Sequence, residues 1–558
     1  AKQSSNNLVL VFGLVFLLVV VLLACAVLVS AALVAFSWVA FSRPPGVPTK
    51  GVLVLKLQGD IAEISTNPFD SLFVEPITVR NVTEALRAAK TDPRITGVLL
   101  RPIQAPALWG KVQELRDALV DFKSSGKPLV AFLEFASERE YVLASAAARV
   151  VLVPAGQLNL TGLASYQVFL RGTFDKIGAT PDLLHIGDYK TAVNTFTEKG
   201  FTPAHREMTE SLNHDTFEQL VAAIARARGK SADEVRGLID EGPMLPDAAL
   251  EHGLVDDVAY YDEIGKTSDL GDGFAELSLD RYLTVARGTR PSLKAPRLAV
   301  LYAVGTIVSG NGSGPTGSDV GSDKLTEAIR EIRNDDSIKA VVLRVDSPGG
   351  STVASDVIWR ELMLLRARKP LVVSMSDLAA SGGYYIAMPG HVIVAQPGTL
   401  TGSIGIFSGK FVTGGTYGKL GMQIEAVSEG KYAEMYSPTR TFNAAERRKV
   451  EEHMQAFYDQ FVEKVAESRA STPEKIDAIA QGRVWTGRQA REHGLVDELG
   501  GLPRAIAIAQ QRAGIAKDEA VNVVVYPRKP TVFEALTLLG GGQGARAAMV
   551  EALLPEAD

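Results

Sequence analysis

The stretch Ile338-Lys-Ala-Val-Val-Leu-Arg-Val-Asp-Ser-Pro-Gly-Gly-Ser351 indicates how this sequence folds. It is an apolar, β-branched run that ends in a turn of small residues, which is typical of a buried strand in a parallel sheet. About thirty residues further on, Asp377-Leu-Ala-Ala-Ser-Gly-Gly-Tyr-Tyr385 places a serine directly before two glycines. Similar β-branched runs alternate with amphipathic helical segments along the chain, so we predict an α/β fold with largely parallel strands.

The sequence contains this unit twice. The later copy follows the earlier one by about 242 residues, the spacing between Lys127 and Lys369, and this period is too long for a solenoid repeat. We therefore predict a tandem duplication. The paired stretches are Gly51–Leu57 and Arg297–Tyr302, Ile95–Arg101 and Ile338–Arg344, Lys127–Val130 and Lys369–Val372, Leu160–Gly162 and Leu400–Gly402, and Glu251–Asp256 and Glu492–Asp497.

The predicted domain boundaries follow from the duplication. A segment rich in proline and glycine separates the copies and is typical of a linker. The boundaries are an N-terminal segment at 1–50, a first repeat at 51–283, the linker at 284–296, a second repeat at 297–528 and a C-terminal tail at 529–558.

The N-terminal segment has a long stretch without charge, from Leu8 to Phe41. A helix of that length reaches about 50 Å, beyond the ~30 Å of a bilayer's hydrocarbon core, whereas a signal peptide needs an apolar core of only about 7–15 residues. We expect an uncleaved membrane anchor. Lys2 precedes the stretch and Arg43, Lys50 and Lys56 follow it, which by charge alone weakly favours a cytoplasmic body.

Composition excludes several classes of protein. The chain has 558 residues, 46% of them hydrophobic, and a net charge of -6, so nothing favours a nucleic-acid partner. Cys25 is the single cysteine, which excludes an intramolecular disulfide and a cysteine-based metal site. We expect no metal and no cofactor.

The two glycine tracts of the second repeat have the residue types that acyl transfer requires. Ser381 supplies a hydroxyl, and the backbone amides of Gly382 and of Gly349 or Gly350 can approach a ligand closely because no Cβ shields them. Together they favour a hydrolase with a serine nucleophile and an oxyanion site.

The first repeat lacks these tracts. It has Arg101-Pro-Ile-Gln-Ala-Pro106 and Ala136-Ser-Glu-Arg139 in the corresponding places. Proline has no backbone N–H, and the other side chains crowd the amides that remain. We therefore expect the chemistry in the second repeat, with the first repeat supporting it.

The residue pattern alone does not identify the general base that would activate Ser381. His252 and His493 recur in the duplicated closing motif, so we interpret them as structural residues. His391 leads into a predicted buried strand. The Gly-x-Ser-x-Gly motif is absent around Ser381, because Ala379 stands at its first glycine position. The helical stripe that contains Phe457 and Phe461 is assigned to the core.

A lysine is the other option, and it must be buried to act as a base. Lowering its pKa from about 10.4 to about 7.5 requires ~4 kcal/mol of destabilisation of the charged form. Lys190, within Ile186-Gly-Asp-Tyr-Lys-Thr-Ala192, and Lys431, within Ser428-Glu-Gly-Lys-Tyr-Ala433, both qualify.

The glycine tracts, the Gly-Asp-Tyr-Lys-Thr-Ala tract and the duplication together resemble signal peptide peptidase A in its long, double-length bacterial form (protease IV). The resemblance covers residues 51 to about 528. It implies tandem Clp/crotonase-like domains and a membrane-anchored serine endopeptidase at the bacterial inner membrane, with its body on the periplasmic or extracytoplasmic side. It also implies that the enzyme degrades apolar signal-peptide remnants and assembles as a homotetramer.

The resemblance further implies which residues act. Ser381 matches the nucleophile of the long form, and Lys190 matches its base, supplied by the first copy. The short form takes its lysine from the serine's own copy, four residues before a Ser-Pro-x-Arg tract. Here that tract is Ser437–Arg440 and Ala433 stands at the lysine's place, so Lys431 remains the alternative base.

The sequence does not exclude two other functions. A crotonase-like enzyme would use the paired amides to hold an acyl-CoA enolate and would need no nucleophilic serine. A membrane scaffold on a degenerate protease fold would have no activity at all. Labelling of Ser381 by a fluorophosphonate would distinguish the peptidase from the crotonase-like enzyme, and peptidase activity that is lost in Lys190→Met would exclude the scaffold.

Overall fold

The computed structural model describes residues 21–22, 25–26, 28–30, 32, 48, 50–65, 76–104, 107–286, 295–312 and 319–528. None of the helices in these ranges is long and apolar enough to cross a membrane. Most of the predicted span at 8–41, most of the linker at 284–296 and the whole tail at 529–558 lie outside the described residues.

The first repeat folds around a six-stranded sheet in which every neighbouring pair is parallel, in the order β6-β4-β3-β2-β1-β7. Leu53, Leu55 and Leu100 in its strands are fully buried, as expected for strands covered on both faces. Its strands are β1 (Gly51–Gln58), β2 (Ile95–Ile103), β3 (Leu129–Ala136), β4 (Arg149–Leu158), β6 (Asp257–Val258) and β7 (Glu276–Ser278).

Helices cover both faces of this sheet. One face packs against the apolar sides of α2 (Val79–Thr91), α3 (Trp109–Lys123), α4 (Glu138–Ala144) and the end of α7 (Pro203–Arg228). The other face carries α10 (Ile264–Thr267) and its flanking loops. The shorter helices of this repeat are α5 (Arg171–Ile177), α6 (Asn194–Thr197), α8 (Ala232–Asp240), α9 (Pro246–Glu251) and α11 (Leu279–Ala286).

The second repeat forms the same kind of sheet, in the order β16-β14-β12-β11-β8-β18, with β13 and then β17 beside β12. All of its pairs are parallel except β14 with β16. Its strands are β8 (Arg297–Val304), β11 (Ile338–Ser347), β12 (Leu371–Ala380), β13 (Val392–Ala395), β14 (Leu400–Gly402), β16 (Val484–Thr486), β17 (Glu498–Leu499) and β18 (Asn522–Tyr526).

Helices cover this second sheet in the same way. The face that leads to the serine packs against α12 (Ser322–Asn334), α13 (Thr352–Arg366), α14 (Gly382–Ala387) and α16 (Ala444–Ser468), and the other face packs against α19 (Leu502–Arg512). The predicted α/β class and tandem duplication are confirmed. Shorter elements of this repeat include the strands β9 (Thr306–Val308) and β10 (Asp319–Gly321) and the helices α15 (Gly414–Lys419), α17 (Pro473–Asp477) and α18 (Gly487–Glu492).

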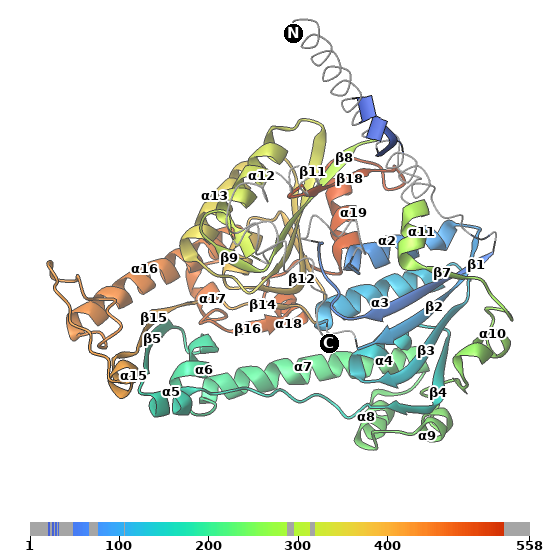
Figure 1. Ribbon diagram of the computed structural model, residues 1–558, viewed down its shortest axis with the longest axis horizontal. Helices are drawn as coiled ribbons and strands as arrows, with labels where there is room; N and C mark the ends of the chain where they lie inside the picture. Colours follow the sequence, from blue (N-terminus) through green and yellow to red (C-terminus); the bar gives the residue numbers. More distant parts are fainter. Residues whose placement is uncertain are drawn as a thin grey trace, which may run out of the picture.

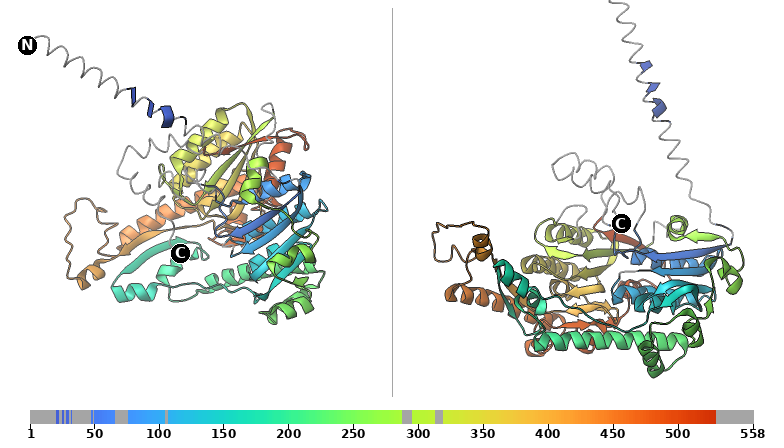
Figure 2. Two further views of the ribbon diagram at one scale, coloured as in Figure 1. Left: turned by 45° about the vertical axis from the view of Figure 1, so that its right-hand side comes forward. Right: turned by 60° about the horizontal axis from the view of Figure 1, so that its bottom comes forward.

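One strand of the first repeat leaves its own sheet. β5 (Thr180–Ile186) pairs antiparallel with β15 (Ile406–Val412) of the second repeat, and Figure 1 shows this ribbon far from β1–β4, beneath α16. Helix α7 then returns along the lower edge of the molecule to the first repeat, as both views of Figure 2 also show. The ribbon and α7 therefore join the two repeats over a long distance.

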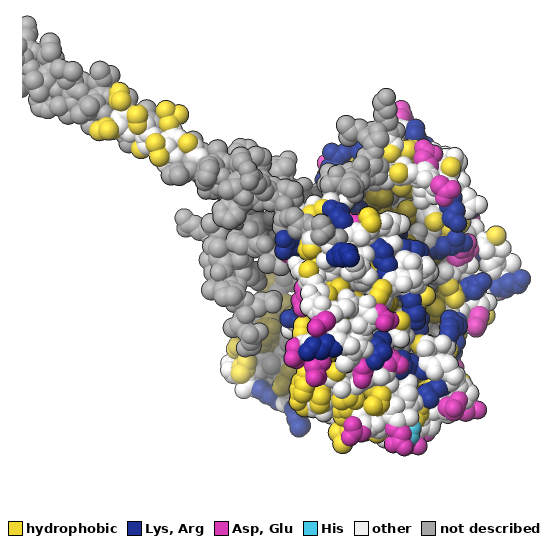
Figure 3. Space-filling view, turned by 90° about the vertical axis from the view of Figure 1, so that its right-hand side faces the viewer, with side chains coloured by type: hydrophobic (Ala, Val, Ile, Leu, Met, Phe, Trp, Pro, Cys, Tyr) yellow, Lys and Arg dark blue, Asp and Glu magenta, His cyan; other side chains and the backbone are white. Residues whose placement is uncertain are grey.

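The described residues on the face of the first repeat that Figure 3 shows form no patch of a single charge. In Figure 3, Lys and Arg side chains alternate there with Asp and Glu, and apolar side chains lie between them. Between the repeats, by contrast, charged groups are buried, and Arg344 of β11 binds Glu63 and Glu114 of the first repeat.

Candidate active site

Ser381 stands on a sharp turn between a strand and a helix. β12 ends at Ala380 and α14 begins at Gly382, so Ser381 alone makes the change of direction, with φ 55° and ψ -117°. A positive φ is unfavourable for a residue with a Cβ and is typical of strained functional turns. The Ser381 amide donates to the carbonyl of Gly402 at 2.9 Å, which holds the turn against β14.

Lys190 of the first repeat reaches this serine within one chain. Its Nζ lies 3.0 Å from Ser381 Oγ, and it also contacts the carbonyl oxygen and Oγ of Ser403, each at 2.9 Å. Only 3% of Lys190 is exposed, and burial lowers the pKa of its amine to about 7. The amine is therefore uncharged in a large fraction of molecules near neutral pH.

The β5–β15 ribbon and a glycine turn position Lys190. The ribbon ends at Ile186, and the Tyr189 amide then donates to the carbonyl of Gln481 at 2.9 Å. A Cβ added to Gly482 would lie 2.5 Å from Lys190 Cα, so only glycine allows the lysine backbone to pass this close.

Two glycines that line the pocket at the serine have backbone amides without a hydrogen-bond partner in the described part of the chain. The Gly349 amide donates to Ser347 Oγ at 3.1 Å, whereas among the described residues the amides of Gly350 and Gly382 have no hydrogen-bond acceptor. A Cβ built on Gly382 would lie 3.1 Å from the Gly350 nitrogen, so these two amides are close neighbours. The geometry thus pairs Gly382 with Gly350 rather than with Gly349.

Gly349 has a different requirement for glycine. Its φ is 96°, and a Cβ there would lie 2.5 Å from the Gly382 nitrogen. Its carbonyl accepts from the Ile307 amide at 2.8 Å, and the Ser351 amide donates back to Ile307 at 2.8 Å. This short bridge to β9 uses the groups on either side of the Gly350 amide and leaves that amide without a partner from the described residues, in the pocket that Ser381 also lines.

The serine opens into a small aromatic pocket of about 90 Å³. Tyr385, Phe407, Phe457 and Phe461 line it, together with Ile406. The helical stripe assigned to the core is indeed part of the second repeat's core, because Phe461 is only 1% exposed, but its edge also forms this pocket. An apolar side chain of a bound ligand could pack against these residues.

The other candidate bases do not line this pocket. Lys431 is exposed and lies over the ring of Tyr432, 5.1 Å from its centroid. His391 Nδ1 accepts from the Leu371 amide at 3.1 Å, and His493 packs on Trp485 with their ring centroids 4.2 Å apart. These two histidines support strands and loops of the second repeat.

Ser403 is the site residue that sequence reasoning missed. It has a φ of 49°, and its amide donates to the carbonyl of Arg483 at 2.7 Å, so it is held beside Lys190. A signal was present in the duplication. The recurring Leu-Thr-Gly is followed by Leu163 in the first repeat and by Ser403 in the second.

A hydroxyl beside a buried amine and two free amides, on a duplicated α/β scaffold, defines a serine peptidase. The sequence matches Peptidase family S49 over residues 121–271 and again over residues 363–516. The chain belongs to peptidase family S49, in its double-length form.

Relatives that match most of this chain are named as proteases. The chain is 36% identical to "Serine protease SPPA, chloroplastic" of Arabidopsis thaliana over 86% of its own length and 72% of the relative's. It is 35% identical to "Protease 4" of Salmonella typhi, over 86% and 77%, and 30% identical to "Protease 4" of Haemophilus influenzae, over 85% and 81%. The resemblance inferred from the motifs is confirmed.

Proposed function

We propose that this serine peptidase is an endopeptidase in which Ser381 is the nucleophile and Lys190 is the general base. The observation that supports this most directly is the 3.0 Å separation of Lys190 Nζ from Ser381 Oγ at a buried site. An amine can act as a base only when it is neutral, and burial, which lowers the pKa of Lys190 to about 7, makes the neutral form accessible.

The contacts of Lys190 are compatible with a neutral amine. Two N–H groups donate to the carbonyl oxygen and Oγ of Ser403, and the lone pair is left to accept the proton of Ser381. As Ser381 Oγ attacks the peptide carbonyl, its proton passes to Lys190. The resulting ammonium then protonates the leaving amine, and an acyl-enzyme forms on Ser381.

Hydrolysis of the acyl-enzyme follows the same route. Water attacks the ester carbonyl while Lys190 accepts a proton, and Ser381 leaves with a proton returned by the lysine. The amides of Gly350 and Gly382 stabilise the oxyanion in both steps. In this proposal the first repeat is retained because it supplies the base.

The proposed substrates are extended apolar peptides, and signal peptides released after secretion are the main class. The pocket beside Ser381 is lined by aromatic side chains, which favours an apolar residue at the cleavage site. The segment around Gly350 already bridges β9 as a strand would, so a peptide adding alongside it by backbone hydrogen bonds is the expected binding mode.

The proposal includes the cellular setting. Segment 8–41 anchors the chain in the bacterial inner membrane, the catalytic body lies on the periplasmic or extracytoplasmic side, and Clp/crotonase-type subunits assemble as a homotetramer. The uncharged length of that segment and the resemblance to the long form of signal peptide peptidase A support this setting.

The two lysines provide a matched test of the base. We expect Lys190→Met to lower kcat/KM on an apolar peptide ester about 10³-fold, because general-base assistance is lost, and to abolish fluorophosphonate labelling of Ser381. Lys431→Met, at an exposed position, is expected to retain full activity. The measurement is kcat/KM on the detergent-solubilised full chain, with labelling followed by mass spectrometry.

Two outcomes would contradict the proposal. If activity survives Lys190→Met but is lost in Lys431→Met, the general base is Lys431 and not Lys190. Acyl-CoA turnover by a Ser381→Ala variant, without peptidase activity in the unmodified chain, favours a crotonase-like reaction instead.

A further inference from the structure

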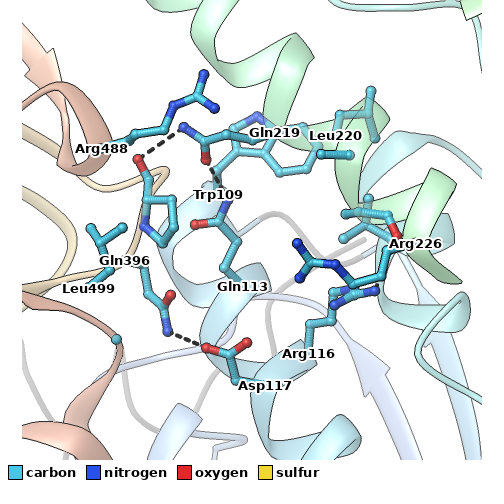
Figure 4. Close-up of a pocket in the computed structure, with 15 residues that line it drawn as sticks. Trp109, Gln113, Arg116, Asp117, Gln219, Leu220, Arg226, Gln396, Arg488 and Leu499 are labelled. Carbon is cyan, nitrogen blue, oxygen red and sulfur yellow. Dashed lines mark hydrogen bonds between the residues drawn. The ribbon is translucent and has the colours of Figure 1, made fainter. Parts of the chain in front are cut away.

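A second pocket, separate from Ser381, lies between the two repeats. It has a volume of about 310 Å³, within the range of small-molecule sites, and shares no lining residue with the aromatic pocket at the serine. Helices α3 and α7 of the first repeat form one side of it. The second repeat closes the other side with Gln396, Pro397 and Arg488 (Figure 4).

Most polar side chains in this pocket already have partners within the protein. Gln113 donates to Gln219 at 2.7 Å, and Gln219 donates to the Pro397 carbonyl at 3.1 Å. Gln396 donates to Asp117 at 3.0 Å. Arg488 is neutralised by Asp215, which its Nε approaches to 2.8 Å.

Two guanidinium groups are not neutralised in this way. Arg226 is exposed at the pocket and, among the described residues, makes no hydrogen bond or ion pair within the protein. Within the same part of the chain, Arg116 donates only to the Ala223 carbonyl, at 3.3 Å, and its buried Nε has no partner there. A buried donor left without an acceptor costs free energy that a bound acceptor would recover.

The two groups also lie at the same end of the pocket (Figure 4). Burial lowers the pKa of Arg116, the carboxylate of Asp117 raises it, and the nearby charge of Arg226 lowers it again. Two like charges placed together without an ion pair of their own make a binding site for an anion.

The remaining walls limit what that anion can be. Trp109, Val142 and Leu220 make one side of the pocket apolar. Of the charged side chains that line it, Arg116 and Arg226 contribute two positive charges, Asp117 contributes one negative charge, and Arg488 is balanced by Asp215. One positive charge is left over, which suits a monoanion better than a dianion.

We propose that this pocket binds an apolar molecule that bears a single carboxylate, held by Arg116 and Arg226 with its apolar part against Trp109 and Leu220. The planar fork of a guanidinium matches the two oxygens of a carboxylate. The carboxyl end of a short apolar peptide has this chemistry. Because the pocket is built from both repeats, its ligand would hold them together.

The test uses N-acetyl-leucine and its neutral amide, N-acetyl-leucinamide, as probes. Binding is measured by calorimetry on the full chain in a Ser381→Ala background, in which neither probe can be processed. We expect saturable binding of the acid and a loss of at least about tenfold in affinity in Arg226→Gln, because a charge-assisted hydrogen bond is removed. Arg116→Gln is the second variant, and Arg206→Gln, on an exposed part of α7, is the matched control that keeps full affinity.

Each outcome decides the matter. The proposal holds if the acid binds, the amide does not, and only the two pocket variants weaken binding. Equal binding of acid and amide, or equal loss in Arg206→Gln, overturns it. Inorganic phosphate that binds as tightly as the acid overturns the assignment to a monocarboxylate, and no binding of the acid at millimolar concentration overturns the site.

Discussion

Burial makes the charged form of Lys190 costly, and for that reason its amine can be neutral and act as a base near pH 7. Only its neutral form can accept the proton of Ser381, and its pKa is about 7. We therefore predict that kcat/KM rises with pH and is half-maximal near pH 7, reaching a plateau about one to two units higher. The measurement is a pH–rate profile on a peptide ester between about pH 5.5 and pH 9.

The midpoint of this profile distinguishes a buried Lys190 from an unburied lysine, because activity rises with pH in both cases. A base with an ordinary lysine pKa would give activity that still rises above about pH 10. A flat profile across pH 7, after correction for unfolding, would rule out titration of Lys190 as the event that activates the enzyme.

The same burial predicts an effect on stability. The pKa of Lys190 falls from 10.5 in the unfolded chain to about 7 in the folded protein. Between these values the unfolded chain binds more protons, so stability rises with pH from about 7 to 10.5 and the full penalty applies below pH 7. We expect Lys190→Met to stabilise the protein at pH 6 by up to about 5 kcal/mol.

Chemical denaturation of the two proteins at pH 6 and pH 9 checks this expectation. The gain in the free energy of unfolding should be smaller at pH 9, because the folded lysine is then neutral and the free energy of removing its proton falls as the pH approaches the unfolded pKa of 10.5. A variant less stable than the unmodified protein at pH 6 would show that the contacts of Lys190 outweigh its desolvation.

For single residues, the sequence was informative at turns whose backbone conformation or close packing requires glycine. Ser381 and the two glycine tracts could be recognised because few other residues tolerate such turns. Ser403 was not recognised, since a serine after Leu-Thr-Gly has no distinctive local pattern. The choice between Gly349 and Gly350 depends on which amide the Ser347 hydroxyl occupies, and only the folded turn reveals that.

The β5–β15 ribbon is the element that brings Lys190 to the serine. Gly409, in β15, has a φ of 146°, and a Cβ there would lie 2.3 Å from the carbonyl oxygen of Asp182 in β5. We predict that Gly409→Ala separates the two strands, displaces the lysine by a fraction of an ångström to an ångström, and lowers kcat/KM about 10²-fold. Steady-state kinetics with the peptide ester measures it.

Gly418→Ala is the matched control, because a Cβ at Gly418 meets nothing within 4 Å. It should leave kcat/KM unchanged. If Gly409→Ala is equally active, the position of Lys190 does not depend on the register of this ribbon.

The strands inside each sheet could be predicted, whereas the ribbon could not. β11 and β2 are apolar runs whose local pattern suffices, and the duplication reinforces each of them. The sequence of β5, Thr-Pro-Asp-Leu-Leu-His-Ile, does not specify that its partner lies more than two hundred residues away. Pairing between repeats is a property of the tertiary structure.

Across the whole molecule, the contact between the repeats is centred on a buried cluster of charges. Arg344 has no exposed surface and binds the two carboxylate oxygens of Glu63 at 2.8 Å each, and Glu114 lies 2.9 Å from it. The corresponding residue of the first repeat, Arg101, pairs with Glu134 at the surface and lies over the rings of Phe132 and Tyr261, all within the first repeat. The duplicated arginine thus became a connection between the halves in one copy alone.

We predict that Arg344→Met destabilises the folded protein by about 3–5 kcal/mol, because it leaves two carboxylates buried without a cation. The deficit should shrink as the pH falls, since the buried carboxyls of Glu63 and Glu114 can then be protonated and need no cation. Denaturation at pH 7.5 and pH 5 measures both effects. The matched control is Glu63→Gln/Arg344→Met/Glu114→Gln, which removes all three charges and should recover much of the loss at pH 7.5. If the triple variant is as unstable as the single one, shape rather than charge balance holds the repeats together, and the pH dependence of the single variant should be absent as well.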